Sequence, residues 1–366
     1  MIERLANNPL ITAGDVKPSR DDFEVMCAFN AGAARYNGQT VLLVRVAERP
    51  RPRTGHVATA VLDPDSGRIE PLYVRRDDQD LDMSDPRVFA YKGVVYLTSI
   101  SHLRLATGAD GRHFSIGDRP VLAPATEYET YGVEDARITR LGAWYYVNYS
   151  AISPRGVTTA LARTRDFARF ERLGIMFSPD NKDIAIFPET IGGRYYVFHR
   201  PSAKPFGAPS MWLASSDNLR DWGRHEFVIG PRPGMWDSER VGCGAAPIRT
   251  ARGWLELYHA SDENTRYCTG ALLLDLELPW KVIARSREPF LFPEAPYETR
   301  GFMPNVVFHN GLIDNGDGTL TLYYGAADDK TCGAIVSIEA ILASLSIPAS
   351  SPARRPVART RRRRVK

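Results

Sequence analysis

The sequence predicts an all-β protein built as a β-propeller of five or six blades. Short turns containing glycine are each followed by a run of aromatic and β-branched residues, a pattern typical of β-hairpins. Such segments recur along the 366 residues at a spacing of roughly 50 to 65 residues, and repeats of this length made of short strands indicate propeller blades. The segments are 36–45, 91–97, 141–147, 191–199, 252–259 and 316–324.

A second recurring pattern supports this prediction. Residues 103–110, 160–166 and 211–217 are apolar runs that close on a Ser/Thr-x-Asp-like turn, where short polar side chains cap their own backbone. Helical periodicity is nearly absent, and only 337–345 predicts a short helix near the C-terminus. We therefore expect one catalytic propeller domain over residues 1–348 and a disordered arginine-rich tail over 349–366.

Composition is that of a globular protein. The chain is 43% hydrophobic, which suffices for a full core, and has 16 Tyr, 15 Phe and 6 Trp, which suit strands and sugar-stacking surfaces. No apolar run has transmembrane length and no signal segment opens the chain, so a cytoplasmic location is expected. The four cysteines are scattered without a C-x-x-C pair, so we expect free thiols and no metal site.

The net charge of +4 is concentrated in the tail. Residues 351–366 hold seven Arg and one Lys, which leaves about −4 on the remainder. The folded body is therefore not expected to bind nucleic acid. For the tail, we favour a solvated and functionally neutral extension over a segment that contacts RNA, DNA or anionic lipid.

A propeller brings polar residues from distant strands together around its central channel. In this chain the expected set holds several cations and few acids: Asn30, Arg45, Asp85, Arg87, Glu134, Asp135, Arg137, Lys182, Asp183, His199, Arg200, Arg240, Tyr258, His259 and Asp328. An inverting glycoside hydrolase needs two carboxylates, one to protonate the leaving oxygen and one to deprotonate water. Inorganic phosphate arrives already anionic, so a single acid beside a cationic cluster favours phosphorolysis.

The segment 132–138, Gly-Val-Glu-Asp-Ala-Arg-Ile, is the centre of this interpretation. Successive side chains of a strand point to opposite faces. Glu134 and Asp135 are therefore expected to face opposite ways, and Arg137 to share a face with Asp135.

The chain resembles glycoside hydrolase family 130, the inverting β-mannoside phosphorylases and related β-mannosidases, which are five-bladed propellers. The resemblance extends from about residue 8 to about residue 345, and its motifs are 29–33, 42–46, 132–138, 182–189, 195–201, 240–248, 301–308 and 323–328. The sequence departs from the common family pattern at Ala31, Ala136, Ala245 and Ala246, where proline is usual, and at Arg240, where lysine is usual.

The resemblance implies a role for each motif residue. Asp135 is the expected proton donor, and it can act through a hydroxyl of the sugar. Lys182 and Arg200 match phosphate-binding positions, and Arg240, Tyr258 and His259 are expected further phosphate contacts. The expected substrate-binding residues are Asn30, Arg45, Glu134, Arg137, Phe302 and Asp328.

The sequence thus predicts an inverting phosphorylase that converts a β-mannoside and inorganic phosphate into α-mannose 1-phosphate and a shortened acceptor. No cofactor is expected beyond phosphate as co-substrate. The expected substrates are β-linked manno-oligosaccharides, mannosyl-glucose or mannosyl-N-acetylglucosamine. Two alternatives stay open: an inverting β-mannosidase on the same fold, and a non-catalytic carbohydrate-binding propeller. The sequence leaves open the acceptor, the linkage and whether the chain forms a homo-oligomer.

Overall fold

The computed structural model describes residues 2–202 and 206–345. Within those residues it contains strands β1 to β26, two short α-helices and one 3₁₀ turn, so the all-β prediction is confirmed. The predicted tail, 349–366, lies outside the described residues.

Most of the described strands form five successive antiparallel units of four strands each. The first unit contains β2 (Phe23–Tyr36), β3 (Gln39–Pro50), β9 (Ile100–Gly108) and β10 (Ser115–Leu122). The second contains β11 (Gly132–Leu141), β12 (Trp144–Ser153), β13 (Gly156–Thr164) and β14 (Glu171–Phe177). The third contains β15 (Asn181–Ile186), β16 (Tyr195–Pro201), β17 (Met211–Ser216) and β18 (Gly223–Ile229).

The last two units complete the series. The fourth contains β19 (Arg240–Cys243), β21 (Gly253–Ser261), β22 (Tyr267–Leu274) and β23 (Val282–Arg285), with the short β20 (Ile248–Thr250) paired to β21. The fifth contains β24 (Val307–Asp314), β25 (Thr319–Ala326) and β26 (Lys330–Ser337), and its outer strand is β1 (Ile2–Arg4) from the N-terminus. Both ends of the described chain are therefore joined in one sheet.

Hydrophobic clusters connect each unit to the next. Four of them join the first unit to the second, the second to the third, the third to the fourth and the fourth to the fifth. A further cluster joins the fifth unit to the first, with Ile313 and Tyr323 packed together with Leu42 and Val44. Each Å² of apolar surface buried contributes about 25 cal/mol, so these contacts are the main contribution that holds the units together.

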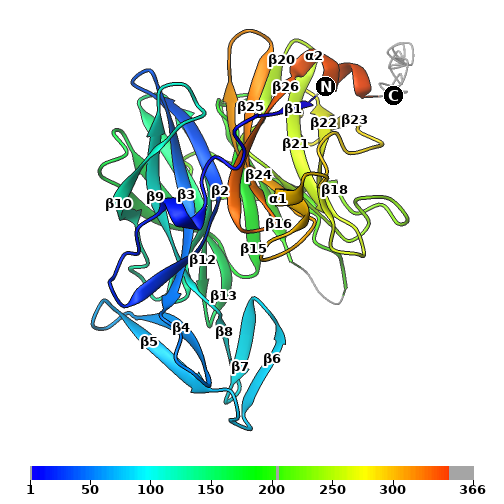
Figure 1. The fold of residues 1–366 in the computed structure, drawn as a ribbon. Coiled ribbons are helices and arrows are strands. Elements are labelled where there is room, and N and C mark those ends of the chain that lie inside the picture. The colour runs from blue at the N-terminus through cyan, green and yellow to red at the C-terminus, as the bar shows by residue number, and fades with distance from the viewer. Residues whose placement is uncertain (1, 203–205, 346–366) are drawn as a thin grey trace, which may run out of the picture.

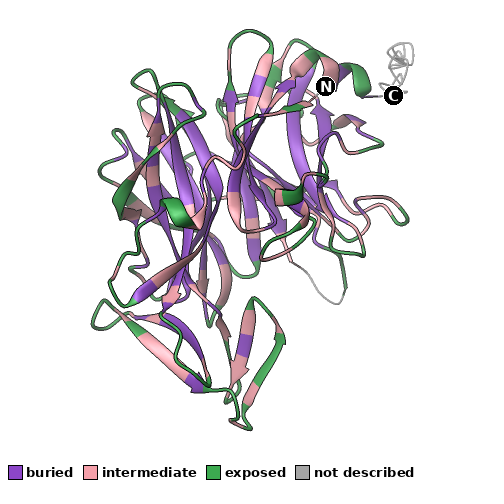
Figure 2. Ribbon diagram, in the orientation of Figure 1, coloured by how far each residue is buried: buried purple, intermediate pink, exposed green. Residues whose placement is uncertain are grey.

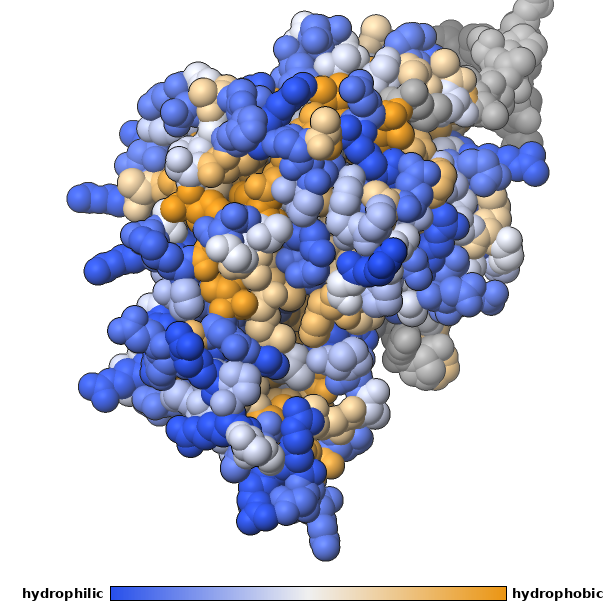
Figure 3. Space-filling view, in the orientation of Figure 1, coloured by the Kyte–Doolittle hydropathy of each residue, from blue (hydrophilic) through white to orange (hydrophobic). Residues whose placement is uncertain are grey.

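A separate lobe, residues 51–99, is inserted between β3 and β9 and extends from the main body (Figure 1). It contains the hairpin β4 (His56–Asp63) and β5 (Arg68–Arg75), and a three-stranded sheet of β6 (Leu81–Asp85), β7 (Val88–Tyr91) and β8 (Val94–Leu97). The predicted hairpin at 91–97 thus exists, but it belongs to the lobe rather than to one of the five units. On the face shown in Figure 3 the lobe is mainly hydrophilic.

Burial differs between the middle and the outer strands of the units, as Figure 2 shows. Every residue of β21 is buried, whereas β18 exposes much of its length. Strands covered on both faces have near-continuous apolar sequences, and half-covered strands alternate. The predicted C-terminal helix is α2 (Ile338–Ser344), where the Ser337 side chain caps the N-terminus by accepting from Ala340 N and where Ile341 and Leu342 are buried.

The remaining elements are the 3₁₀ turn η1 (Ala13–Asp15) and the one-turn helix α1 (Pro296–Thr299). Among the described residues, no helix is long and apolar enough to cross a membrane.

Candidate active site

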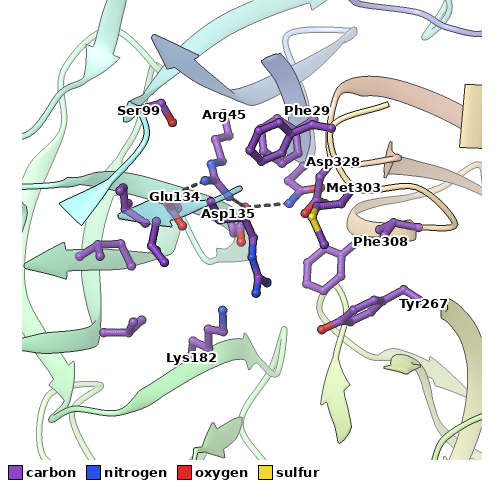
Figure 4. Close-up of a pocket in the computed structure, with 18 of the residues that line it drawn as sticks. Phe29, Arg45, Ser99, Glu134, Asp135, Lys182, Tyr267, Met303, Phe308 and Asp328 are labelled. Carbon is purple, nitrogen blue, oxygen red and sulfur yellow. Dashed lines mark hydrogen bonds and ion pairs between the residues drawn. The ribbon is translucent and has the colours of Figure 1, made fainter. Parts of the chain in front are cut away.

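A cavity of about 290 Å³ is lined by residues from all five units and from the lobe (Figure 4). Nine of the twelve predicted site residues line it: Asn30, Arg45, Glu134, Asp135, Lys182, Arg200, Arg240, Phe302 and Asp328. Three do not: Arg137, Tyr258 and His259. The fold therefore brings together most of the residues that the sequence predicts for the site.

β-Bulges aim the polar side chains at the cavity. The inner strands β2, β11 and β15 each have a register shift at an Asn or Asp, namely Asn30, Asp135 and Asp183. At these three residues φ is 48°, 53° and 53°, in the left-handed region that few residues other than glycine adopt. At each bulge the side chains no longer alternate regularly between the two faces of the strand.

The bulge in β11 corrects the prediction from strand alternation. Glu134 and Asp135 were expected to face opposite ways, yet both line the cavity. Arg137 was expected to share a face with Asp135, yet it is buried behind the cavity wall and donates to the carbonyls of Gly244 and Cys243. The extra residue of the bulge shifts the alternation by one position between Glu134 and Arg137.

Arg45 connects the two adjacent carboxylates. Its Nη2 lies 2.6 Å from Glu134 Oε1 and its Nη1 lies 3.1 Å from Asp135 Oδ1, while Asn30 Nδ2 donates to the same Asp135 oxygen at 2.9 Å. Gly325 leaves room for Asn30, since a Cβ there would lie 1.9 Å from Asn30 Oδ1. Asp135 is thus held by two donors that fix its orientation.

The two neighbouring carboxyls have opposite pKa shifts. Burial raises the pKa of Glu134 above its ordinary value, although Arg45 opposes this. Burial acts on Asp135 in the same direction, but Arg45, the hydrogen bond from Asn30 and the charge of Lys182 together leave its pKa below the ordinary value. Divergent pKa values in adjacent acids are typical of functional sites.

Three cations line the cavity near these acids: Lys182 on β15, Arg200 on β16 and Arg240 on β19. Figure 4 shows Lys182 pointing from β15 toward Glu134 and Asp135. Among the described residues, Arg200 Nη1 is paired with Asp183 Oδ2 at 2.6 Å, whereas Lys182 and Arg240 have no carboxylate within ion-pair distance. Arg240 Nε is also buried without a hydrogen-bond partner. These groups are suited to binding an anion.

The prediction of few acids among many cations was wrong. Five carboxylates line the cavity, from Asp85, Glu134, Asp135, Asp183 and Asp328, against five cations, from Arg45, Arg87, Lys182, Arg200 and Arg240. Buried charges are rarely tolerated unless they are paired, and four of the five acids are paired with an arginine. The numbers of acids and cations are equal, but within the described part of the chain Lys182 and Arg240 have no partner acid.

Asp183 is the buried centre of a charge network that the sequence did not reveal. Its carboxylate contacts Arg137 Nη2 at 3.3 Å, Arg200 Nη1 at 2.6 Å and His259 Nε2 at 3.1 Å. These partners hold its pKa well below the ordinary value despite burial. Burial lowers the pKa of His259 to about 4. His259 therefore contacts Asp183 rather than the cavity.

Tyr258 also lies away from the cavity. Its hydroxyl donates to Asp237 Oδ2 at 2.9 Å, and Asp237 is further paired with Arg232 and Arg285. Tyr258 and His259 are adjacent in β21 and alternate in direction, so both could not have faced a common site.

Asp328 illustrates how burial affects a carboxyl at this site. Burial raises its pKa to about 6, with Arg45 opposing the shift. The folded protein therefore keeps a proton on Asp328 between about pH 4 and 6 that the unfolded chain has lost, so this group's contribution to stability falls as pH rises through that range.

We expect Asp328→Asn to increase the free energy of unfolding at pH 7.5 by about 1–2 kcal/mol, because the amide cannot become a buried charge. A shift of two pKa units would correspond to about 3 kcal/mol. The expected gain in the free energy of unfolding is smaller because the Asp328 side chain is partly exposed. At pH 4.5 the difference should shrink toward zero. Urea unfolding at the two pH values measures it, and an equal difference at both would contradict the assignment.

The remaining lining residues were not assigned roles from the sequence. The lobe supplies Asp85, Arg87, Val88, Leu97, Thr98 and Ser99, and the aromatic walls are Phe29, Tyr267 and Phe308. Asp85 and Arg87 had been placed among the polar channel residues, but nothing in the sequence pattern showed that they lie on an inserted lobe.

Comparison with known proteins places this geometry in a family. A sequence model described as beta-1,4-mannooligosaccharide phosphorylase, of glycoside hydrolase family 130, matches residues 73–346. A relative described as beta-1,2-mannobiose phosphorylase, from Listeria innocua serovar 6a, is 47% identical over 353 residues, which cover 95% of this chain and 99% of the relative. A 1,2-beta-oligomannan phosphorylase from Thermoanaerobacter sp. strain X514 is 41% identical over 245 residues, 66% of this chain and 80% of that protein.

A solved structure agrees with these matches. The beta-1,2-mannobiose phosphorylase from Listeria innocua, in complex with beta-1,2-mannobiose, superposes with a TM-score of 0.91 at 47% identity and covers 94% of this chain and 99% of that one. The chain therefore belongs to glycoside hydrolase family 130.

Proposed function

We propose that this protein is an inverting mannoside phosphorylase that cleaves a β-mannosidic bond with inorganic phosphate to give α-mannose 1-phosphate and a shortened acceptor. The observation that carries the proposal is a single cavity that holds both the firmly held carboxyl of Asp135 and cations, among them Lys182 and Arg240, which have no ion-pair partner in the described residues. The family match and the descriptions of the relatives support it. Because two relatives are described by β-1,2 linkages, β-1,2-mannobiose is the substrate to test first.

The proposal gives each of these residues a role. Asp135 supplies the proton to the leaving acceptor, directly or through a sugar hydroxyl. Lys182, Arg200 and Arg240 bind phosphate and hold it in line with the bond being broken, which lowers the entropic cost of the reaction. Asn30, Arg45, Glu134, Phe302 and Asp328 surround the mannosyl unit. Phosphate is the only co-substrate proposed, since an anionic nucleophile needs no general base.

Two predicted site residues receive a different role in this proposal: His259, expected to contact phosphate, and Arg137, expected to bind substrate. His259 and Arg137 hold Asp183, and Asp183 in turn positions Arg200. They are positioning residues, because neither lines the cavity.

The architecture proposed for this site is a five-bladed propeller formed by one domain over the body of the chain. The five four-stranded units support it, as does the cluster that packs the fifth unit against the first. Phosphate and sugar would meet where the inner strands converge.

Lys182→Ala tests the phosphate site. We expect the KM for phosphate to rise about 10- to 100-fold, because a charge-assisted contact to a dianion is lost, while the KM for mannobiose changes little. Lys17→Ala removes an exposed lysine paired with Asp118 and serves as the control. Phosphorolysis is followed by the appearance of α-mannose 1-phosphate.

The same assay separates the alternatives. Release of free mannose by the wild-type protein at equal rates with and without phosphate would identify a β-mannosidase. Binding of mannobiose without turnover in either condition would identify a non-catalytic carbohydrate-binding protein.

A further inference from the structure

The lobe reaches the cavity through one short stretch of chain. Residues 85–99 contribute Asp85, Arg87, Val88, Leu97, Thr98 and Ser99 to its lining. The lobe has its own apolar cluster, which includes Val57, Val74 and Phe89. Tyr96 connects that cluster to the main body by packing on Tyr131, with the ring centroids 5.7 Å apart. The lobe is therefore a packed wall of the cavity.

Asp85 and Arg87 form a planar, two-bonded pair on this wall. Arg87 Nε lies 3.0 Å from Asp85 Oδ1 and Nη2 lies 2.6 Å from Oδ2, and the backbone N–H of Arg87 also donates to Oδ1 at 2.8 Å. Thr98 fixes the turn, since its hydroxyl donates to Pro86 O at 3.1 Å and its N–H donates to Arg87 O at 2.9 Å. The Arg87 side chain is nonetheless 53% exposed and that of Asp85 33% exposed.

The chemistry of this pair suits a neutral, hydroxyl-rich ligand. Arg87 has further N–H donors and Asp85 has further acceptor capacity, and adjacent sugar hydroxyls both donate and accept. A phosphate dianion is disfavoured here because it would meet the Asp85 carboxylate beside Arg87. The neighbouring Val88 and Leu97 provide apolar surface for the C–H face of a sugar ring.

The position of the pair indicates which half of the substrate it meets. In an inverting phosphorolysis, phosphate attacks opposite to the leaving acceptor, so the two occupy opposite sides of the mannosyl carbon. The three phosphate cations lie on β15, β16 and β19, in the third and fourth units, whereas the lobe is inserted in the first.

We propose that the Asp85–Arg87 pair binds hydroxyl groups of the acceptor sugar, the half that leaves during phosphorolysis, and so determines acceptor preference. This inference rests on the proposed function and assigns the acceptor end of the same cavity to the lobe.

The test uses the synthetic direction, where donor and acceptor are varied separately. With α-mannose 1-phosphate as donor and mannose as acceptor, Arg87→Ala is expected to raise the KM for mannose about 10- to 100-fold and to leave the KM for α-mannose 1-phosphate within about twofold. Arg87→Lys keeps the charge but loses the planar guanidinium group, so its KM for mannose is expected to lie between those of the wild type and Arg87→Ala.

The lobe offers a matched control. Arg75 and Asp77 form the same kind of pair, with Nε 2.9 Å from Oδ1 and Nη2 2.6 Å from Oδ2, but both side chains are about 70% exposed and neither lines the cavity. Arg75→Ala should leave both KM values unchanged. Thermal unfolding of all variants checks that the lobe stays folded.

The outcomes separate the two proposals. An unchanged KM for mannose in Arg87→Ala, or an increase confined to α-mannose 1-phosphate, would overturn the assignment of the acceptor end while the phosphorylase proposal stands. A wild-type protein that forms no disaccharide from α-mannose 1-phosphate would overturn the proposed function, and the assignment with it.

Discussion

Replacing Asp135 by asparagine is expected to lower kcat for phosphorolysis of β-1,2-mannobiose by about 10³-fold, because the leaving oxygen loses its proton donor. The amide oxygen can still accept from Asn30 and Arg45, so the geometry of the bulge is preserved and the thermal midpoint should change little. Turnover within about tenfold of wild type would remove Asp135 from the mechanism.

The resting pKa of Asp135 bears on this role. It is lowered in part by the charge of Lys182. A phosphate dianion bound to Lys182 offsets that charge and raises the proton affinity of Asp135 when the nucleophile is in place. The carboxyl is thereby protonated more readily in the complex that reacts than in the empty protein.

Two controls separate proton donation from charge. Glu134→Gln removes a neighbouring carboxylate that is also paired with Arg45, and should cost less activity than Asp135→Asn. An aryl β-mannoside such as the 2,4-dinitrophenyl compound needs little protonation of its leaving group, so the loss in Asp135→Asn should be much smaller with it. An equal loss on both substrates would indicate a structural role instead.

The hairpins could be predicted because their signals are local. Glycine turns such as 37–38 and 142–143 are followed by β-prone runs, and the structure forms hairpins at each. The same local signal occurs at 91–97 within the lobe. A hairpin of the main body and an inserted one are indistinguishable locally, because what separates them is long-range packing.

Side-chain direction at the site could not be predicted from strand alternation. Asn30, Asp135 and Asp183 interrupt their strands with positive φ, and a bulge reverses the alternation for every residue after it. One signal was present: all three are Asn or Asp, the residue types other than glycine that tolerate the left-handed region best. An Asn or Asp within a β-prone run that opens a predicted inner strand is therefore a candidate bulge.

Asp183 is a charge centre because side chains from distant parts of the chain meet at it, and no local sequence pattern predicts such a meeting. Its partners come from β11, β16 and β21, which belong to three different units. The sequence indicated Asp183 only as one member of the polar set around the central channel and gave no sign of its partners. In the structure Asp183 is 2% exposed, and its bulge turns it inward.

Asp183→Asn is expected to lower the free energy of unfolding by about 3–5 kcal/mol, because it leaves the buried cations Arg137 and Arg200 without their counter-ion. Asp77→Asn is the matched control. It breaks the exposed pair with Arg75, and a surface pair contributes at most about 1 kcal/mol. Urea unfolding at pH 7 gives both values.

The pH dependence provides a second, independent check on Asp183. Its pKa in the folded protein lies well below that in the unfolded chain, so its stabilisation is fully present above about pH 4 and is lost as pH falls further. The difference between wild type and Asp183→Asn should therefore be constant from pH 5 to 8 and should narrow only in more acidic solution. A difference below about 1 kcal/mol at pH 7, or one that varies between pH 5 and 8, would show that Arg200 is not held by this carboxylate. In that case Asp183→Asn would leave the KM for phosphate unchanged. If Arg200 is held by Asp183, the same variant should displace Arg200 and raise the KM for phosphate.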